Sequence, residues 1–269
     1  MHTSNVMKVM TLTGVLILST LLSACGSGGL ILGSIRGSGN VTTESRQVSN
    51  ITGVQLDTSG DLTLSQGDSE SLTIEAEDNL LPLLTSEIIN GTLKLGTKPN
   101  TSISATKPIK YTLVVKNIAA LSANGSGNIA ASDLVSGDNF QLTLSGSGSL
   151  DLSSLKSNKV AINLNGSGSA AIATLNTQSL GAVLSGNGTL ELSGTTADQN
   201  INLSGSGDFK GENLVSKTAV ANTNGSGDII LQVSDTLVAT SSGSGDITYI
   251  GNPSVTQQRS GSGKITQKS

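Results

Sequence analysis

The 269-residue sequence contains few of the residues that usually build catalytic or binding sites. It has no tryptophan, two tyrosines, two phenylalanines and a single histidine, His2. An N-terminal leader peptide would carry His2 away, which excludes Ser-His-Asp catalysis and removes the commonest metal ligand. The scarcity of aromatic rings argues against a surface that stacks on sugars.

Basic residues are also in the minority. Lysine and arginine number 15 against 19 aspartates and glutamates, for a formal net charge of −4. An acidic chain is a poor partner for a phosphate backbone, so we expect no nucleic-acid binding. The single cysteine, Cys25, excludes an intrachain disulfide.

Cys25 ends a stretch with the pattern of a bacterial lipoprotein leader. One lysine, Lys8, precedes an apolar run over residues 9–21, and Leu22-Ser23-Ala24-Cys25 matches a lipobox. The run is short for a membrane span. We therefore predict that residues 1–24 are a signal peptide, although an ordinary secretory signal with a chance cysteine remains the alternative.

The leader predicts where the protein resides. The Cys25 thiol would carry a diacylglycerol, and residues 25–36 would be a lipidated tether without a spanning helix. The protein would be exported and lipid-anchored in the cell envelope. Gly26 lacks the aspartate that retains some Gram-negative lipoproteins at the inner membrane, which favours the outer membrane or cell surface.

What the sequence does contain is a repeated Gly-Ser-Gly phrase, once Gly-Asn-Gly. From one final glycine to the next the steps are 21, 20, 20, 19, 20, 18 and 18 residues. We predict turns at every copy, because glycine reaches positive φ and also lets stacked backbones approach closely. The turn glycines are Gly125, Gly127, Gly146, Gly148, Gly166, Gly168, Gly186, Gly188, Gly205, Gly207, Gly225, Gly227, Gly243, Gly245, Gly261 and Gly263.

Apolar residues alternate within each unit and recur one unit later. Leu150 and Leu152 are followed 20 residues on by Ala170 and Ile172. A period of two indicates strands with one buried face, and a constant unit length indicates stacked units. The pattern predicts an all-β, right-handed parallel β-solenoid (β-helix) with about 18–21 residues per rung. An antiparallel sandwich would explain the alternation but not the constant register.

Both ends of the repeat are less regular. We expect a domain over residues 37–269, with less regular N-terminal rungs over 37–120 and regular repeats over 121–269. Residues 78–84 read as a loop or short helix that covers the side or end of the coil. Near the C-terminus, Gln257 and Arg259 fall at inward positions, which indicates a polar end against end-to-end stacking.

The ordered series of motifs resembles a known family. It consists of Gly37-Ser38-Gly39-Asn40-Val41, residues 53–64, residues 72–81 and the later Gly-Ser-Gly-Asn/Asp-Ile copies. Together they resemble the "putative auto-transporter adhesin, head GIN domain" family of exported bacterial proteins, a domain of unknown function. The resemblance covers roughly residues 37–265. It implies a β-solenoid in the cell envelope and brings no catalytic residues.

Three aspartates follow consecutive turns: Asp208, Asp228 and Asp246. In a solenoid they would lie about 4.8 Å apart, rung to rung. One interpretation is a weak calcium site, since hard cations prefer carboxylate oxygens. The other is that each aspartate bonds the amides of its own turn, with Lys264 capping the row. No other cofactor is indicated.

The sequence thus favours a non-enzymatic envelope protein, structural or adhesin-like, whose partner is a glycan or an envelope protein. The alternative is a cation-dependent or carbohydrate-active β-helix protein that binds or cleaves a polysaccharide. Its candidate residues would be Asp208 with the lysines Lys156, Lys159, Lys210 and Lys217. Such enzymes need long loops over a groove, and these units leave no room for them.

Overall fold

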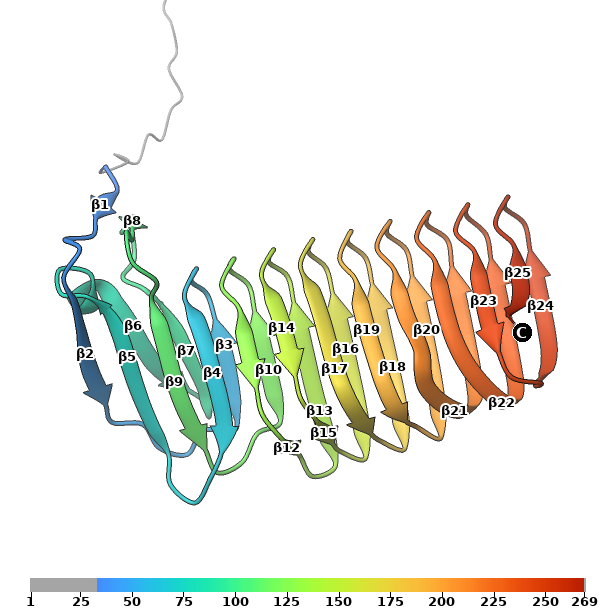
Figure 1. The fold of residues 1–269 in the computed structure, drawn as a ribbon, viewed down its shortest axis with the longest axis horizontal. Coiled ribbons are helices and arrows are strands. Elements are labelled where there is room, and N and C mark those ends of the chain that lie inside the picture. The colour runs from blue at the N-terminus through green and yellow to red at the C-terminus, as the bar shows by residue number, and fades with distance from the viewer. Residues whose placement is uncertain (1–32, 269) are drawn as a thin grey trace, which may run out of the picture. The chain divides into compact units, whose positions relative to one another are not determined.

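The computed structural model describes residues 33–268, which form a parallel β-solenoid of about seven turns (Figure 1). The predicted solenoid is confirmed. The predicted signal peptide and the predicted lipidation site, Cys25, lie outside the described residues. Within those residues, no helix has both the length and the apolar character needed to span a membrane.

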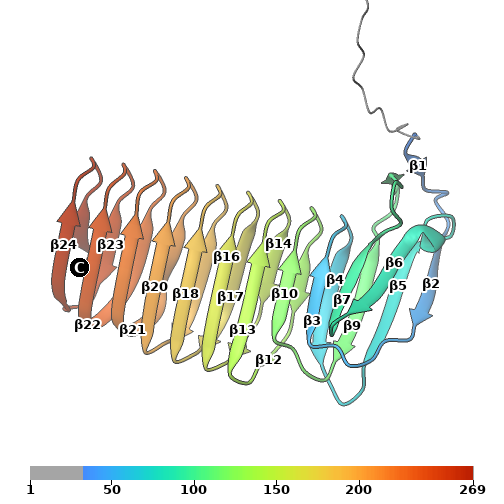
Figure 2. The same ribbon diagram turned by 180° about the vertical axis from the view of Figure 1, so that it is seen from behind.

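Each regular rung has two sides joined by the glycine turn and an opposite corner. In one rung, β17 (Ser169–Asn176) leaves a glycine turn and β18 (Ser179–Leu184) leads to the next. We name the strands after each turn the post-turn sheet and those before it the pre-turn sheet. Figures 1 and 2 show the rungs side by side from opposite directions.

The strands of each sheet pair in parallel with the next rung. The post-turn sheet contains β4 (Asp61–Gln66), β11 (Ile129–Ala131), β12 (Leu134–Val135), β14 (Ser149–Leu152), β15 (Leu155–Lys156), β17, β19 (Leu190–Thr195), β23 (Ile247–Ile250) and β25 (Ile265–Lys268). The pre-turn sheet contains β3 (Gly53–Leu56), β10 (Ala120–Ala123), β13 (Asn139–Leu144), β16 (Lys159–Leu164), β18, β20 (Asp198–Leu203) and β24 (Ser254–Arg259). The long strands β21 (Phe209–Thr223) and β22 (Ile229–Ser241) contribute to both sheets.

The core is a thin aliphatic column between the two sheets. Leu180, Ala182 and Leu184 on β18 face Leu190 and Leu192 from the post-turn side, and all five are buried. Outward neighbours in the same strands are small or polar. Stacking is what removes this apolar surface from water, since one rung alone could not cover it.

The glycines of the repeat are required by close approach. A Cβ on Gly168 would lie 2.0 Å from the carbonyl oxygen of Gly148, and one on Gly166 would lie 1.9 Å from that of Gly146. The positive-φ glycines of the described residues are Gly39, Gly91, Gly194 and Gly251, none of them among the sixteen turn glycines between Gly125 and Gly263. The positive-φ explanation was therefore wrong for these turns, and the close-approach explanation is confirmed.

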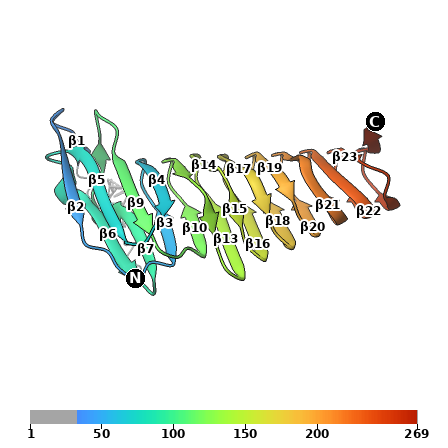
Figure 3. The same cartoon turned by 60° about the horizontal axis from the view of Figure 1, so that its bottom comes forward.

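The repeat predicts less regular rungs over residues 37–120. The structure instead combines parallel strands stacked out of chain order with antiparallel strands. β7 (Thr92–Thr97) pairs with β3, and β9 (Lys110–Val115) pairs with β4, on the side away from β10 and β11. The later segment thus stacks outside the earlier one (Figure 3). Beyond it lie antiparallel strands: β5 (Ser71–Glu77) on β9, β2 (Val41–Arg46) on β5 and β6 (Leu84–Ile89) on β7.

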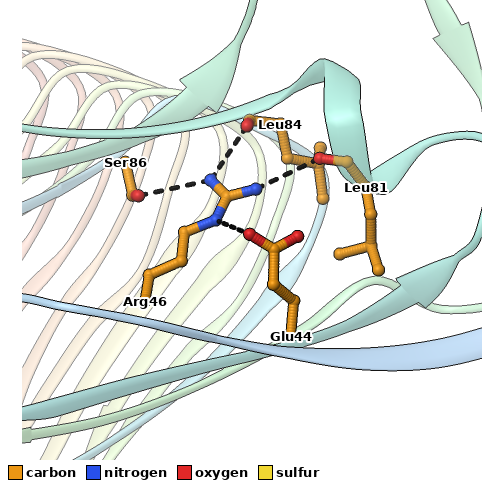
Figure 4. Close-up of polar contacts among 5 residues, drawn as sticks. All are labelled: Glu44, Arg46, Leu81, Leu84 and Ser86. Atoms are coloured by element: carbon orange, nitrogen blue, oxygen red, sulfur yellow. Dashed lines mark hydrogen bonds and ion pairs between the residues drawn. The ribbon is translucent and has the colours of Figure 1, made fainter.

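A short helix covers this end, as predicted for residues 78–84. It is the 3-10 helix η1 (Leu81–Leu83). Arg46 on β2 holds it by donating to the carbonyl oxygens of Leu81 at 3.1 Å and Leu84 at 2.9 Å (Figure 4). The same guanidinium bonds Ser86 and pairs with Glu44. These contacts tie the outermost strand to the body.

The C-terminal rung ends the column with polar side chains. In register, Gln257 follows buried Ala239 and Arg259 follows buried Ser241, yet both Gln257 and Arg259 are exposed. The predicted polar end is confirmed. A charge at an inward position of an edge strand disfavours pairing with a further apolar rung.

Candidate functional site

An open groove of about 720 Å³ crosses the outer surface of the post-turn sheet. It spans five strands in register, β4, β11, β14, β17 and β19. The residues aligned along its floor are Thr63, Ala130, Asp151, Ala171 and Glu191. The glycine repeat by itself does not predict this groove.

A bend in the central rungs shapes the groove. The buried residues Leu152 and Leu155 are three positions apart instead of two, because Ser153 and Ser154 interrupt the strand between β14 and β15. The same three-residue step separates Ile172 from Leu175. In the 18-residue rung of β22, by contrast, Ile229, Leu231 and Val233 alternate without interruption. The broken alternation was the signal in the sequence that could have located the groove.

The groove carries negative charge over a floor of small residues. Asp151 and Glu191 are two rungs apart with Ala171 between them, so their Cα atoms are separated by roughly 10 Å. Within residues 33–268 neither carboxylate forms an ion pair. Ser149 donates its hydroxyl hydrogen to Asp151 at 3.0 Å. Beyond Glu191 the row continues with Lys210, a larger side chain that follows the last residues of the groove.

The three candidate calcium ligands form a ladder of hydrogen bonds between rungs. Asp208 Oδ1 accepts the backbone N–H of Asp228 at 3.0 Å, and Asp228 Oδ1 accepts that of Asp246 at 2.8 Å. Asp246 Oδ1 accepts the backbone N–H of Lys264 at 2.7 Å. The carboxylates thus bond the amide of the following rung, which corrects the expectation that each bonds the amides of its own turn.

The described part of the chain gathers no group of three or more His, Cys, Asp or Glu side chains suited to hold a metal ion. One oxygen of each aspartate in the ladder is already committed to a backbone amide. Calcium binding at Asp208, Asp228 and Asp246 stays a prediction.

The lysines of the enzymatic alternative do not converge. Lys210 is aligned with Glu191 on the post-turn sheet, whereas the backbone of Lys217 bonds Ala197 at the opposite corner. Lys159 begins a strand of the pre-turn sheet, paired with Ser179. Lys156 lies in the short strand β15 of the post-turn sheet. The structure therefore assembles no shared site from these lysines and Asp208.

A buried carboxylate, Glu77, anchors the N-terminal end, and no motif or spacing in the sequence pointed to it. It accepts the Thr106 hydroxyl and the backbone N–H groups of Gly39 at 2.6 Å, Thr106 at 2.8 Å and Lys107 at 3.4 Å. The Thr106 hydroxyl contributes most to lowering the pKa of Glu77 to about 2; burial opposes the shift and the backbone donors add to it. Its role is to join two distant segments of the chain.

One family of known proteins matches the repeated part of the chain. The family model described as "Putative auto-transporter adhesin, head GIN domain" matches residues 50–173 and again residues 142–253. The chain belongs to this family. The predicted membership of the head GIN domain family is thereby confirmed, and its two overlapping matches reflect the repeated rungs.

Solved structures share the head GIN domain fold seen here. A putative lipid binding protein from Parabacteroides distasonis ATCC 8503 has a TM-score of 0.84 and 27% identity, covering 88% of this chain and 100% of its own. A putative adhesin from Parabacteroides merdae ATCC 43184 has a TM-score of 0.84 at 22% identity, covering 88% and 99%. A putative adhesin from Parabacteroides distasonis ATCC 8503 has a TM-score of 0.82 at 21% identity, covering 88% and 100%. No curated protein matches the chain.

Proposed function

We propose that this head GIN domain protein is a non-enzymatic, adhesin-like module, lipid-anchored through Cys25 and exposed on the cell envelope. The observation that carries the proposal is the five-strand groove with Asp151 and Glu191 on its floor. The description of the family and the names of the related structures support an adhesive role. The leader sequence supports the anchor and the outer membrane or cell surface as its location.

The residues that line the groove favour an envelope protein over a glycan or an acidic polysaccharide as the partner. Its lining contains no aromatic ring on which a sugar could stack. Its two carboxylates would repel an acidic polysaccharide, which disfavours the enzymatic alternative. Small side chains on the floor let an extended chain lie close to the sheet. An extended segment of an envelope protein, with basic side chains toward Asp151 and Glu191, fits these features best.

A binding screen of envelope proteins and glycans against the acylated protein tests the proposal. Ala171→Arg places a long side chain in the groove, and Ala161→Arg is the matched control on the outer surface of the pre-turn sheet. We expect Ala171→Arg to weaken binding at least about 10-fold, since it adds bulk and a repelling charge. Equal binding by both variants would contradict the groove as the contact surface.

The screen is run with and without calcium to separate the alternatives. If chelating calcium abolished binding, the binding site would be assigned to Asp208, Asp228 and Asp246 instead of the groove. The anchor is tested independently by labelling cells with a radioactive fatty acid. We expect the label on the wild-type protein and none on Cys25→Ala, and a persistent label on the variant would contradict the assignment.

A further inference from the structure

At the N-terminal end a small projection stands apart from the solenoid sheets. Its two strands, β1 (Ile35–Arg36) and β8 (Ile103–Ser104), pair in parallel and form a separate two-stranded sheet. Ile35 lies beside Ile103, and Arg36 beside Ser104. Figures 1 and 2 both show the projection above the body at the N-terminal end.

The projection combines exposed basic and apolar side chains. Residues 88–132 contain five lysines and no acidic residue, in a chain whose net charge is −4. Arg36, Lys98 and Lys107 are exposed and form no ion pair within residues 33–268. Ile35, next to Arg36 in β1, is 42% exposed.

The acidic groups nearby do not cancel this charge. Glu77 is enclosed by hydrogen-bond donors, as described above, and Glu75 pairs with Lys110 at 3.0 Å. Asp78 is exposed, but it accepts the Ser38 hydroxyl and the backbone N–H of Asn79. The three cations therefore outnumber the two remaining carboxylates, the enclosed Glu77 and the exposed Asp78.

The lipid anchor of the proposed function would bring the projection close to a membrane. Ile35 is ten residues from the predicted lipid on Cys25, so the chain length limits their separation to about 36 Å. Cations within reach of an anionic surface are attracted to it, and an adjacent apolar side chain adds burial at the headgroup level.

We propose that the projection formed by β1 and β8, with residues 98–107, is a membrane-contact element that docks on anionic phospholipid headgroups through Arg36, Lys98, Lys107 and Ile35. The inference rests on the lipid anchor of the proposed function and defines which part of the body faces the bilayer. The element would fix the orientation of the solenoid on the membrane instead of leaving it free on its tether.

A fluorescent label on a single thiol tests the contact in the acylated protein. Acylation of Cys25 leaves Ser102→Cys as the sole free thiol in the projection, and Ser262→Cys provides a matched label in the last glycine turn. The labelled proteins are inserted in vesicles of phosphatidylcholine with or without phosphatidylglycerol, each carrying a quencher on a lipid. We expect strong quenching at position 102 only with phosphatidylglycerol, and weak quenching at position 262.

Charge reversal provides the decisive comparison. Lys98→Glu with Lys107→Glu should lower the quenching at position 102 to the level at position 262, whereas Lys210→Glu with Lys217→Glu should leave it unchanged. Equal quenching at both labels, or insensitivity to the Lys98 and Lys107 reversal, would overturn the membrane-contact element.

A second measurement separates this inference from the anchor. Intact mass reports whether Cys25 is acylated. The unacylated Cys25→Ser chain is then sedimented with phosphatidylglycerol vesicles, where we expect the Lys98 and Lys107 reversal to reduce the bound fraction at least about 10-fold. Unacylated Cys25 with intact vesicle binding would reject only the anchor, and acylated Cys25 without charge-dependent binding would reject only the contact element.

Discussion

A Cβ atom on Gly148 would lie 1.9 Å from the carbonyl oxygen of Gly127. The two glycines occupy the same position in consecutive turns, and the contact recurs along the repeat. It sets how closely the rungs stack, because any larger residue would push one backbone away from the next. The repeated phrase is thus a packing requirement between neighbouring turns.

Gly148→Ala should destabilise the protein by about 3 kcal/mol, since the added methyl overpacks against backbone that cannot move aside alone. Gly181→Ala is the control: its Cβ would meet no atom within 4 Å, so we expect a change below about 0.5 kcal/mol. Denaturant unfolding of both variants measures the difference. Equal effects of the two substitutions would contradict the close-approach explanation.

Glu77 should make stability depend on acid pH. Its pKa is lowered in the folded chain from 4.5 to about 2, chiefly by the hydrogen bond from the Thr106 hydroxyl. A carboxyl with a depressed pKa stabilises the fold fully above pH 4.5, and this contribution is lost as the pH falls through about 2. The wild type should therefore exceed Glu77→Gln in unfolding free energy at neutral pH, and the difference should shrink in acid.

Unfolding of the two proteins across that pH range provides the measurement. The exposed Glu87→Gln variant gives the baseline for removing one surface carboxylate. A difference between the wild type and Glu77→Gln that stays constant with pH would show that the Glu77 charge does not hold the N-terminal segments.

The aspartate ladder should tolerate asparagine but not alanine. Asn128 Oδ1 already accepts the Ser149 N–H at 2.9 Å in the same geometry, so Asp228→Asn should keep the bond and reduce repulsion along the row. Asp228→Ala should cost about 1 kcal/mol through the lost bond. The unfolding midpoints of both variants, with calcium and with chelator, give the answer. A calcium-dependent rise in the wild type that Asp228→Asn abolishes would establish a cation site instead.

The polar C-terminal rung should keep the protein from associating end to end. Gln257→Leu with Arg259→Leu continues the inward apolar column and leaves an uncovered edge, so we expect concentration-dependent oligomers in light scattering. Gln258→Leu is the control, because it continues the outward row after Thr240. Monomeric behaviour of the double variant at high concentration would argue against this role.

The amino-acid sequence by itself determined the strands of each rung and how consecutive rungs stack. The alternation of Leu150 and Leu152 is followed by that of Val160 and Ile162, and both recur 20 residues later. These two alternations specify two strands per unit and the register of each unit on the next. The inward Arg259 likewise showed that the column ends there. These features are local and periodic, so the buried face and the stacking direction follow from counting residues.

Only the tertiary structure decided which segments meet at the N-terminal end and what lies on the outer surface. β7 and β9 stack outside the earlier β3 and β4, and Glu77 finds its donors at Gly39 and Thr106, because distant segments must jointly cover the end of the column and satisfy buried polar groups. No residue spacing encodes such pairings. The groove with Asp151 and Glu191 likewise requires five strands in register, a property that no single rung possesses.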